Sequence, residues 1–411
     1  MPQLLPRLRL DLEFMPSPAP ERPGLLIRDP YRYSDASLIV PPALMGCLQL
    51  FDGGHTELDL RAALVRLTGD LKVGELQQHL VSALSQAGFL DDETGRRMKA
   101  AQIGAFAEAA QRGPSQAGAA YPEQPEALRA TLAGWMDGAA AAAAGDSLIG
   151  IAAPHVSPDG GRESYRAAYA ALGPQYKERV FVILGTSHYG EQERFGLTSK
   201  PFATPLGLAQ TEVALGERLA REAGPAAKME DYCHAVEHSI EFQVVFLQHL
   251  YGAGVRILPI LCGAFARGIL EEGRPEQDEN LRRFFDALKE IAEREGRRLF
   301  WVLGVDMAHM GRRYGDTFEA RAGEGAMSAV AELDRGRIER LAAGDAEGFW
   351  GAVRKNRDPL KWCGASPFYT FLKAVPQARG ELLHYQQWNI DEASVVSFGA
   401  MAFRQNLEAV Q

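Results

Sequence analysis

Three apolar runs of the chain each lead into a segment that carries a histidine. The runs are LIGIAAPH (148–155), RVFVILGTSH (179–188) and FWVLGVDMAH (300–309). Each is unbroken and rich in β-branched or aromatic residues, which is typical of a strand buried on both faces of a parallel sheet. Open α/β sheets place their sites at the carboxyl ends of such strands. We therefore expect His155, His188 and His309 to meet at one sheet edge, where imidazoles can bind a metal ion or transfer protons.

A second group of side chains that can bind metals or exchange protons lies in DYCHAVEHSIE, residues 231–241. Its carboxylates have two interpretations. Negative charge is favoured at a helix N-terminus for dipole reasons alone, or the cluster faces the site as acid, base or partner of a metal ligand. We favour the second interpretation for His238. For His234 and Glu241 both interpretations stay open.

Asp306 stands three residues before His309, a spacing that places both side chains on one face of a helical turn. Asp306 can cap the end of its strand by accepting backbone hydrogens, or it can line the site. The two roles are compatible.

Cys363 lies in WCGASPFYTF, just ahead of Ser366 and Pro367, which are typical of a helix start. A thiol near a helix N-terminus is favoured as thiolate, the form that binds metals or acts as a nucleophile. A buried, inert cysteine is the competing interpretation. The other cysteines lie far apart, which favours reduced structural thiols over a disulfide framework.

Two imidazoles and a thiolate suit Fe(II), copper or Zn, whereas Mg or Ca would require more oxygen ligands. Three protein ligands leave a position open for water, dioxygen or a substrate oxygen. If Asp306 or Glu237 were the third ligand in place of Cys363, the set would be the two-histidine, one-carboxylate triad of non-heme iron oxygenases.

Strands and helices alternate after Leu148, which predicts a three-layer α/β/α domain with a largely parallel central sheet. The expected strands are 148–153, 179–184, 255–261, 298–305, 383–388 and 394–402. The expected helices are 163–172, 208–223, 239–251, 278–295, 322–343, 346–356 and 366–375. The alanine run at 139–145 is expected to be a mobile loop or a helix end.

The N-terminal part predicts a separate, small α+β domain that is winged-helix-like. Residues 1–23 are a proline-containing tail or edge strand, and 24–92 contain two short strands, 25–28 and 37–40, followed by three short helices. Residues 93–114 are expected to form a linker helix before the larger domain, 115–404.

Length and charge limit the classes of function. At 411 residues the chain exceeds what one hydrophobic core usually serves, so two domains are expected. The formal net charge of -9 argues against non-specific electrostatic binding of nucleic acid or anionic lipid. No run approaches the roughly 20 apolar residues of a membrane span, and charges interrupt the N-terminal segment where a signal peptide would need its apolar core. We therefore expect a cytoplasmic protein.

The motifs APH, GTSH, EHSIE, DMAH, CG with Pro367, and QWNIDEASVVSFGAMAF occur in an order that resembles the Memo-like family. That family includes the AmmeMemoRadiSam system protein B group and is similar in fold to class III extradiol dioxygenases. The resemblance implies metal ligands at His155, His188 and Cys363. It also implies that Asp306, His309 and His238 line the same pocket, and that the metal is iron, with copper also associated with the family.

The chain departs from this family at three places beside the site. Val156-Ser157-Pro158 replaces the usual Ala-Gly-Tyr, Gly304-Val305 stands where serines are common, and Ala365-Ser366 replaces a histidine-bearing pair. The expected ligands are retained while their surroundings differ. The family's substrate is therefore not carried over.

The N-terminal segments LLIRDPYRYSDASLIVPP, FDGGHTELDL and LVSALSQAGFLDD resemble PqqD-like domains, which bind leader or partner peptides through a strand edge and a helix. The resemblance implies a peptide or protein partner, such as a radical-SAM or AMMECR-type protein, although a purely structural cap remains an equal alternative. DNA binding is disfavoured because no helix of the module is dense in Lys or Arg.

Three hypotheses follow. The first is a metal-dependent redox enzyme in which His238 or His309 transfers protons and Asp306 orients an imidazole. The second is a non-catalytic metal-binding scaffold that captures a partner peptide through its N-terminal domain. The third is a zinc hydrolase using metal-bound water, for which the sequence offers no particular feature.

Overall fold

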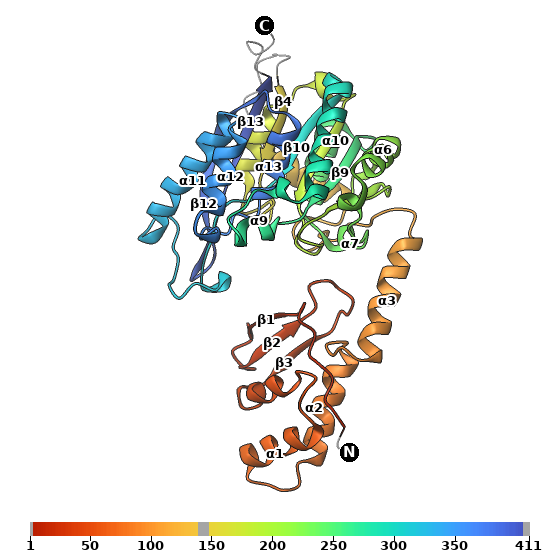
Figure 1. Ribbon diagram of the computed structural model, residues 1–411, viewed down its shortest axis with the longest axis vertical. Coiled ribbons are helices and arrows are strands. Elements are labelled where there is room, and N and C mark those ends of the chain that lie inside the picture. The colour runs from red at the N-terminus through yellow and green to blue at the C-terminus, as the bar shows by residue number, and fades with distance from the viewer. Residues whose placement is uncertain (1–2, 139–147, 406–411) are drawn as a thin grey trace. The chain divides into compact units, whose positions relative to one another are not determined.

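The computed structural model describes residues 3–138 and 148–405, and the chain divides into two compact units, Met1–Ala109 and Ala110–Gln411 (Figure 1). The alanine run expected at 139–145 lies outside the described residues. None of the described helices is long and apolar enough to cross a membrane.

The first unit packs helices against a small antiparallel sheet. Its elements are β1 (Glu13–Pro16), β2 (Leu25–Arg28), β3 (Ser37–Val40), η1 (Pro42–Leu50), α1 (Glu57–Thr68), α2 (Gly74–Gln86) and α3 (Glu93–Glu108). The sheet order is β1-β2-β3, so the N-terminal segment, predicted as a tail or an edge strand, contributes the edge strand β1 beside the two predicted strands. The N-terminal segment also contributes to the core, because Leu5 and Leu12 are buried in it.

The second unit is built on a ten-stranded sheet. Its strands are β4 (Leu148–Ala153), β5 (Val180–Thr186), β6 (Phe195–Leu197), β7 (Phe202–Thr204), β8 (Gly207–Thr211), β9 (Arg256–Cys262), β10 (Leu299–Gly304), β11 (His309–Gly311), β12 (Ala378–Asp391) and β13 (Ser394–Gln405). The order is β11-β13-β4-β10-β5-β9-β8-β7, with β12 on β13 and β6 on β9. The neighbours from β4 to β8 run parallel, which confirms the predicted sheet.

Helices cover both faces of this sheet, and β5 shows why. Val180, Val182 and Leu184 enter one core, while Phe181 and Ile183 enter the other, as the two-residue period of a strand requires. One core receives α6 (Val213–Ala223), α10 (Glu279–Glu295), α11 (Ala326–Ala342), α12 (Ala346–Arg354) and α13 (Ala365–Ala374), several of them in front of the sheet in Figure 1. The other receives α4 (Pro125–Met136), α5 (Arg162–Ala170) and α8 (Glu241–Tyr251). The predicted three-layer α/β/α arrangement is confirmed.

The helix predicted over 208–223 is wrong in its first part. Residues Gly207–Thr211 form β8, which pairs with β9 and with β7, and the helix begins only at Val213. Gly207 has φ +124°, a backbone conformation that favours glycine and makes the tight connection from β7 possible. Pairing with strands elsewhere in the fold therefore outweighs the helical pattern of this segment.

Short elements complete the second unit. They are η2 (Pro174–Tyr176), η3 (Gly224–Ala227), α7 (Cys233–Val236), α9 (Ala266–Leu270), η4 (Pro275–Gln277), η5 (Gly296–Arg298), η6 (Arg312–Tyr314) and η7 (Lys355–Arg357).

Candidate metal centre

The centre lies at the carboxyl ends of three neighbouring strands, β4, β10 and β5. Gly304 at the end of β10 is in register with Ala153 of β4 and Gly185 of β5, so the segments that follow these strands start side by side. A Cβ atom built on Gly304 would lie 2.1 Å from the backbone oxygen of Ser239, and one on Gly185 would lie 2.5 Å from the Ser239 Oγ. Only glycine allows the Ser239 segment to rest directly on the strand ends.

Three imidazoles gather above these ends. The ring centroids of His155 and His188 are 5.0 Å apart, those of His155 and His238 5.3 Å, and those of His188 and His238 5.0 Å. One nitrogen from each ring lies within 4.8 Å of the others, close enough to hold one metal ion after small adjustments. The structure thus brings His238 into the same cluster as the two predicted histidine ligands.

His155 is oriented by the backbone. Its Nδ1–H donates to the backbone oxygen of Gly304 at 2.9 Å, and its own backbone N–H donates to Oδ1 of Asp306 at 2.9 Å. The lone pair of the neutral ring therefore lies on Nε2, which is 3.3 Å from the Cys363 sulfur and 3.4 Å from Oδ2 of Asp306.

His188 is oriented by a buried carboxylate. Its Nδ1 lies 3.1 Å from both oxygens of Glu237, which also accepts backbone N–H groups from His188, His238 and Ser239. Burial opposes ionisation of Glu237, yet the charge and hydrogen bonds of His188 hold the pKa of the carboxyl well below its usual range. Glu237 is therefore the hydrogen-bond partner of the His188 imidazole, an arrangement that fixes the ring and directs Nε2 toward the cluster.

Cys363 reaches the cluster from the segment before α13. Thr186 donates its hydroxyl to the Cys363 backbone oxygen at 3.0 Å, and the Gly364 N–H donates to the backbone oxygen of Asp306 at 3.0 Å. Burial opposes ionisation of the thiol, but the charges of His155 and His309 lower the pKa of Cys363 to about 5. The sulfur is a thiolate at neutral pH, which is the metal-binding form.

The imidazoles differ in charge. Burial disfavours the charged form of His155, but the Asp306 and Cys363 charges outweigh it and raise its pKa to about 9. For His238, burial lowers the pKa to about 3, so this ring is neutral at pH 7. Burial also opposes the charged form of His188, but the Glu237 charge and the hydrogen bond with Cys363 raise its pKa well above the usual value. A metal ion would have to displace a proton from His155 and from His188, whereas His238 offers a free base.

Asp306 and His309 occupy different positions at the centre. Asp306 accepts the backbone N–H of His155 and Val156, and its Oδ2 lies 3.4 Å from Nε2 of His155. His309 turns Nδ1 toward the backbone oxygens of Met307 at 3.0 Å and Lys361 at 3.2 Å. His309 lies outside the three-imidazole group.

A sequence model of the Memo-like protein family matches residues 112–402. The chain belongs to the Memo-like family. It is 25% identical to a MEMO1 family protein of Aquifex aeolicus over 92% of this chain and 95% of that protein. It is 28% identical to a MEMO1 family protein of Methanopyrus kandleri over 72% of this chain and 99% of that protein. It is 31% identical to one of Pyrococcus furiosus over 54% of this chain and 72% of that protein.

In this Memo-like protein a buried arginine holds the backbone of the segment that carries Glu237 and His238. Arg112 is fully buried and pairs with Glu241, and it donates Nε–H to the backbone oxygen of His234 at 2.9 Å. The same guanidinium donates to the backbone oxygen of Glu237. Glu241 also accepts the backbone N–H of Ser115 at 2.9 Å. Glu241 and His234 thus belong to a supporting network, and Arg112, which fell in the predicted linker, was missed.

A second supporting residue was also missed. Gln243 on α8 donates to the backbone oxygen of Pro154 at 2.9 Å and accepts the hydroxyl of Tyr169 at 2.8 Å, so it fixes the residue before His155. One sequence signal was present, because a glutamine inside the apolar helix EFQVVFLQHL must find hydrogen-bond partners when it is buried.

One of the departures from the family pattern has a packing role. Val156 forms an apolar cluster with Val396 and Phe398, against which Trp388 and Tyr314 pack. The Tyr314 ring meets the His309 ring edge-on at a centroid distance of 4.9 Å. The segment after His155 therefore forms part of an apolar and aromatic wall next to the centre.

Proposed function

We propose that this Memo-like protein binds a redox-active transition metal on His155, His188 and Cys363 and uses it in a redox reaction related to that of class III extradiol dioxygenases. The donor set suits Fe(II), copper or Zn, and the family resemblance favours Fe(II). The proposal rests on one observation. Donor atoms from three distant segments converge, and the second nitrogen of each histidine ring is held by a hydrogen bond to another group. Nδ1 of His155 is held by Gly304 and Nδ1 of His188 by Glu237, which leaves Nε2 of each ring for an ion.

The donor set fits such a metal. Neutral imidazole and thiolate are borderline to soft ligands, and the lowered pKa of Cys363 supplies the thiolate without a strong base. A bound metal would supply an open coordination position and one-electron chemistry. The chain's own residues would then orient and exchange protons. Glu237 and the backbone oxygen of Gly304 hold the two rings through Nδ1, while Asp306 holds the backbone of His155. Neutral His238, within the same cluster, can accept a proton from a bound molecule.

Metal analysis of anaerobically purified protein tests the binding site. We expect close to one iron or copper per chain in the wild type and a large loss in Cys363→Ser. Cys262→Ser is the matched control, because the Cys262 side chain packs in an apolar core and is not one of the clustered donors, so this variant should leave the metal content unchanged. Equal metal content in Cys363→Ser and wild type would return Cys363 to a structural role.

Oxygen uptake tests the redox reaction separately. The metal-loaded wild type is incubated with catechol-type compounds, and His238→Gln serves as the comparison. We expect uptake per bound metal to fall in the variant because the neutral base is lost, and the metal content is measured beside it because His238 also belongs to the three-imidazole group. Absence of uptake by a fully loaded wild type would argue against the dioxygenase-like reaction.

A second candidate function, a metal-binding scaffold that captures a partner peptide, rests on the first unit. There β3 lies at the edge of the sheet and pairs with β2 on one side, so its other side can accept an extended peptide. Binding of an AMMECR-type or radical-SAM protein to the full chain, lost when residues 1–109 are removed, would favour this function. Equal binding by both proteins would exclude the first unit as the capture site.

A further inference from the structure

The segment that leads into Cys363 has a strained backbone. Asn356, Arg357 and Asp358 have φ values of 56°, 57° and 51°, and Lys361 has a φ of 53°. These values lie in the left-handed region, which costs free energy for residues that carry a Cβ atom. Such a conformation persists only where surrounding contacts impose it. The contacts that hold this segment therefore bear on where the Cys363 sulfur lies.

Trp362, the residue directly before Cys363, is held at three points. Its backbone N–H donates to Oδ2 of Asp358 at 2.7 Å. Its indole Nε1–H donates to Oδ1 of Asp334 at 2.7 Å, and the Arg337 guanidinium lies over the ring at 5.2 Å from its centroid. Trp362 is 3% exposed, so a movement of the ring would leave buried polar groups unpaired.

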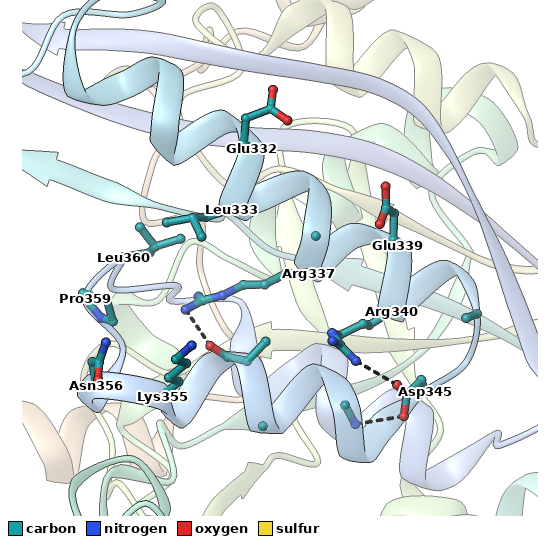
Figure 2. Close-up of a pocket in the computed structure, with 15 residues that line it drawn as sticks. Glu332, Leu333, Arg337, Glu339, Arg340, Asp345, Lys355, Asn356, Pro359 and Leu360 are labelled. Carbon is teal, nitrogen blue, oxygen red and sulfur yellow. Dashed lines mark hydrogen bonds and ion pairs between the residues drawn. The ribbon is translucent and has the colours of Figure 1, made fainter.

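Two of these contacts come from one helix, because Asp334 and Arg337 stand three residues apart on α11. Figure 2 shows Arg337 reaching from α11 toward α12 at a hollow of about 900 Å³, and the side chain donates to the backbone oxygen of Ala352 at 3.2 Å. Its guanidinium also forms a buried ion pair with Asp358 at 2.8 Å. The helix therefore supports Trp362 through its ring and, by way of Asp358, through its backbone.

Asp334 also holds the segment that follows β10. It is fully buried, and its Oδ2 accepts the hydroxyl of Ser397 at 2.6 Å and that of Tyr385 at 2.8 Å. The Ser397 Oγ in turn accepts the backbone N–H of Ala308 at 2.8 Å. Asp334 thus joins the segment after β10 to the segment that carries Cys363.

We propose that Asp334 and Arg337 are positioning residues for the Cys363 sulfur. They act through Trp362, and this role presupposes the proposed function, in which Cys363 is a metal ligand. The sulfur lies 3.3 Å from Nε2 of His155, and a shift of the residue before it would change this separation. Asp334 and Arg337 affect a bound metal only by fixing the geometry in which the sulfur is presented.

Anaerobic titration of the full-length, metal-free protein with Co(II) tests this role, because a thiolate bound to cobalt gives a charge-transfer absorption band. The wild type should show the band. Trp362→Phe keeps an aromatic ring but removes the Nε1–H. We expect about a tenfold loss of Co(II) affinity and a weaker band in this variant. The affinity is measured by competition with a chelator.

Trp350→Phe is the matched control for folding. Trp350 is buried in the same core as Trp362, and its Nε1–H donates to the backbone oxygen of Gly273 at 2.9 Å. The control therefore removes the same ring and the same kind of hydrogen bond, but on α12. We expect a similar fall in melting temperature with wild-type Co(II) affinity and band. A purely structural role of Trp362 would make the two variants alike in every measurement.

Asp358→Asn tests the ion pair with Arg337 separately. Asparagine tolerates the left-handed backbone and can still accept the Trp362 N–H, while the charge that pairs with Arg337 is lost. We expect a smaller loss of affinity than in Trp362→Phe, because the indole hydrogen bond remains. Asp345→Asn removes the charge from an exposed ion pair beside α12 and should bind Co(II) as the wild type does.

The results that would overturn the positioning role are distinguishable from failure of the proposed function. Wild-type affinity and an unchanged band in Trp362→Phe remove the positioning role and leave the metal site intact. If Trp362→Phe does not fold, wild-type affinity in Asp358→Asn has the same consequence. A wild type that binds Co(II) without the thiolate band contradicts Cys363 as a ligand and overturns both proposals.

Discussion

The metal centre and the Arg112 network are both buried polar clusters, and residues 234–241 contribute to each. In the network the charges are satisfied within the protein: Glu241 accepts from Arg112, Ser115, Gln116 and Tyr121. At the centre the hydrogen bonds to surrounding groups are made by Nδ1 of His155 and of His188. Nε2 of these two rings and the sulfur of Cys363 therefore face one another. The difference separates a cluster whose charges are paired within the fold from one whose donor atoms face one another.

Removing a charge from the supporting network should have the largest effect. Arg112→Met leaves Glu241 buried without its cation, and we expect the free energy of unfolding to fall by about 3–5 kcal/mol in urea titrations. Arg282→Met is the control, since Arg282 forms an exposed ion pair with Glu279 and should change stability by less than about 1 kcal/mol. Equal effects of the two substitutions would contradict the contrast drawn here.

The pH dependence of stability should reveal His234. Burial lowers its pKa to about 4 from the usual 6.5, so the unfolded chain binds a proton more readily than the folded protein. Stability should therefore be lost as pH falls from about 6.5 to 4, by about 3 kcal/mol from this group. His234→Gln should remove that part of the slope. Since His238 titrates in both proteins, the difference between their unfolding curves isolates His234.

The role of the hydrogen bond between Glu237 and Nδ1 of His188 can be tested by substitution of Glu237. Glu237→Gln keeps the shape of the side chain but removes the charge that orients Nδ1 of His188, and we expect metal affinity to fall about 10–100-fold. The dissociation constant is measured by competition with a chelator. The exposed neighbour Glu230 provides the control, and Glu230→Gln should bind metal as the wild type does. Unchanged affinity in both variants would mean that the carboxylate does not position the ligand.

The sequence predicted the parallel sheet because its strands are unbroken apolar runs whose period places alternate residues in two cores. It also predicted that His155 and His188 meet, because parallel strands end at the same edge. It could not identify Arg112, whose partner Glu241 lies 129 residues away, since ordinary buried ion pairs leave no local pattern. The predicted start of the helix at residue 208 was wrong for a similar reason. The strand β8 forms there because it pairs with β9, and its own residues do not indicate a strand.

The glycines at the ends of β5 and β10 have a consequence for how such proteins diverge. Gly304 rests against the backbone oxygen of Ser239 and Gly185 rests against the Ser239 Oγ, so the positions of His155 and His188 depend little on the size of more distant side chains. The side chains around Val156 and Trp388 pack in a cluster of their own, so they can change without displacing His155 and His188. Relatives that exchange these wall residues would acquire a differently shaped surface while the arrangement of the imidazoles stays in place.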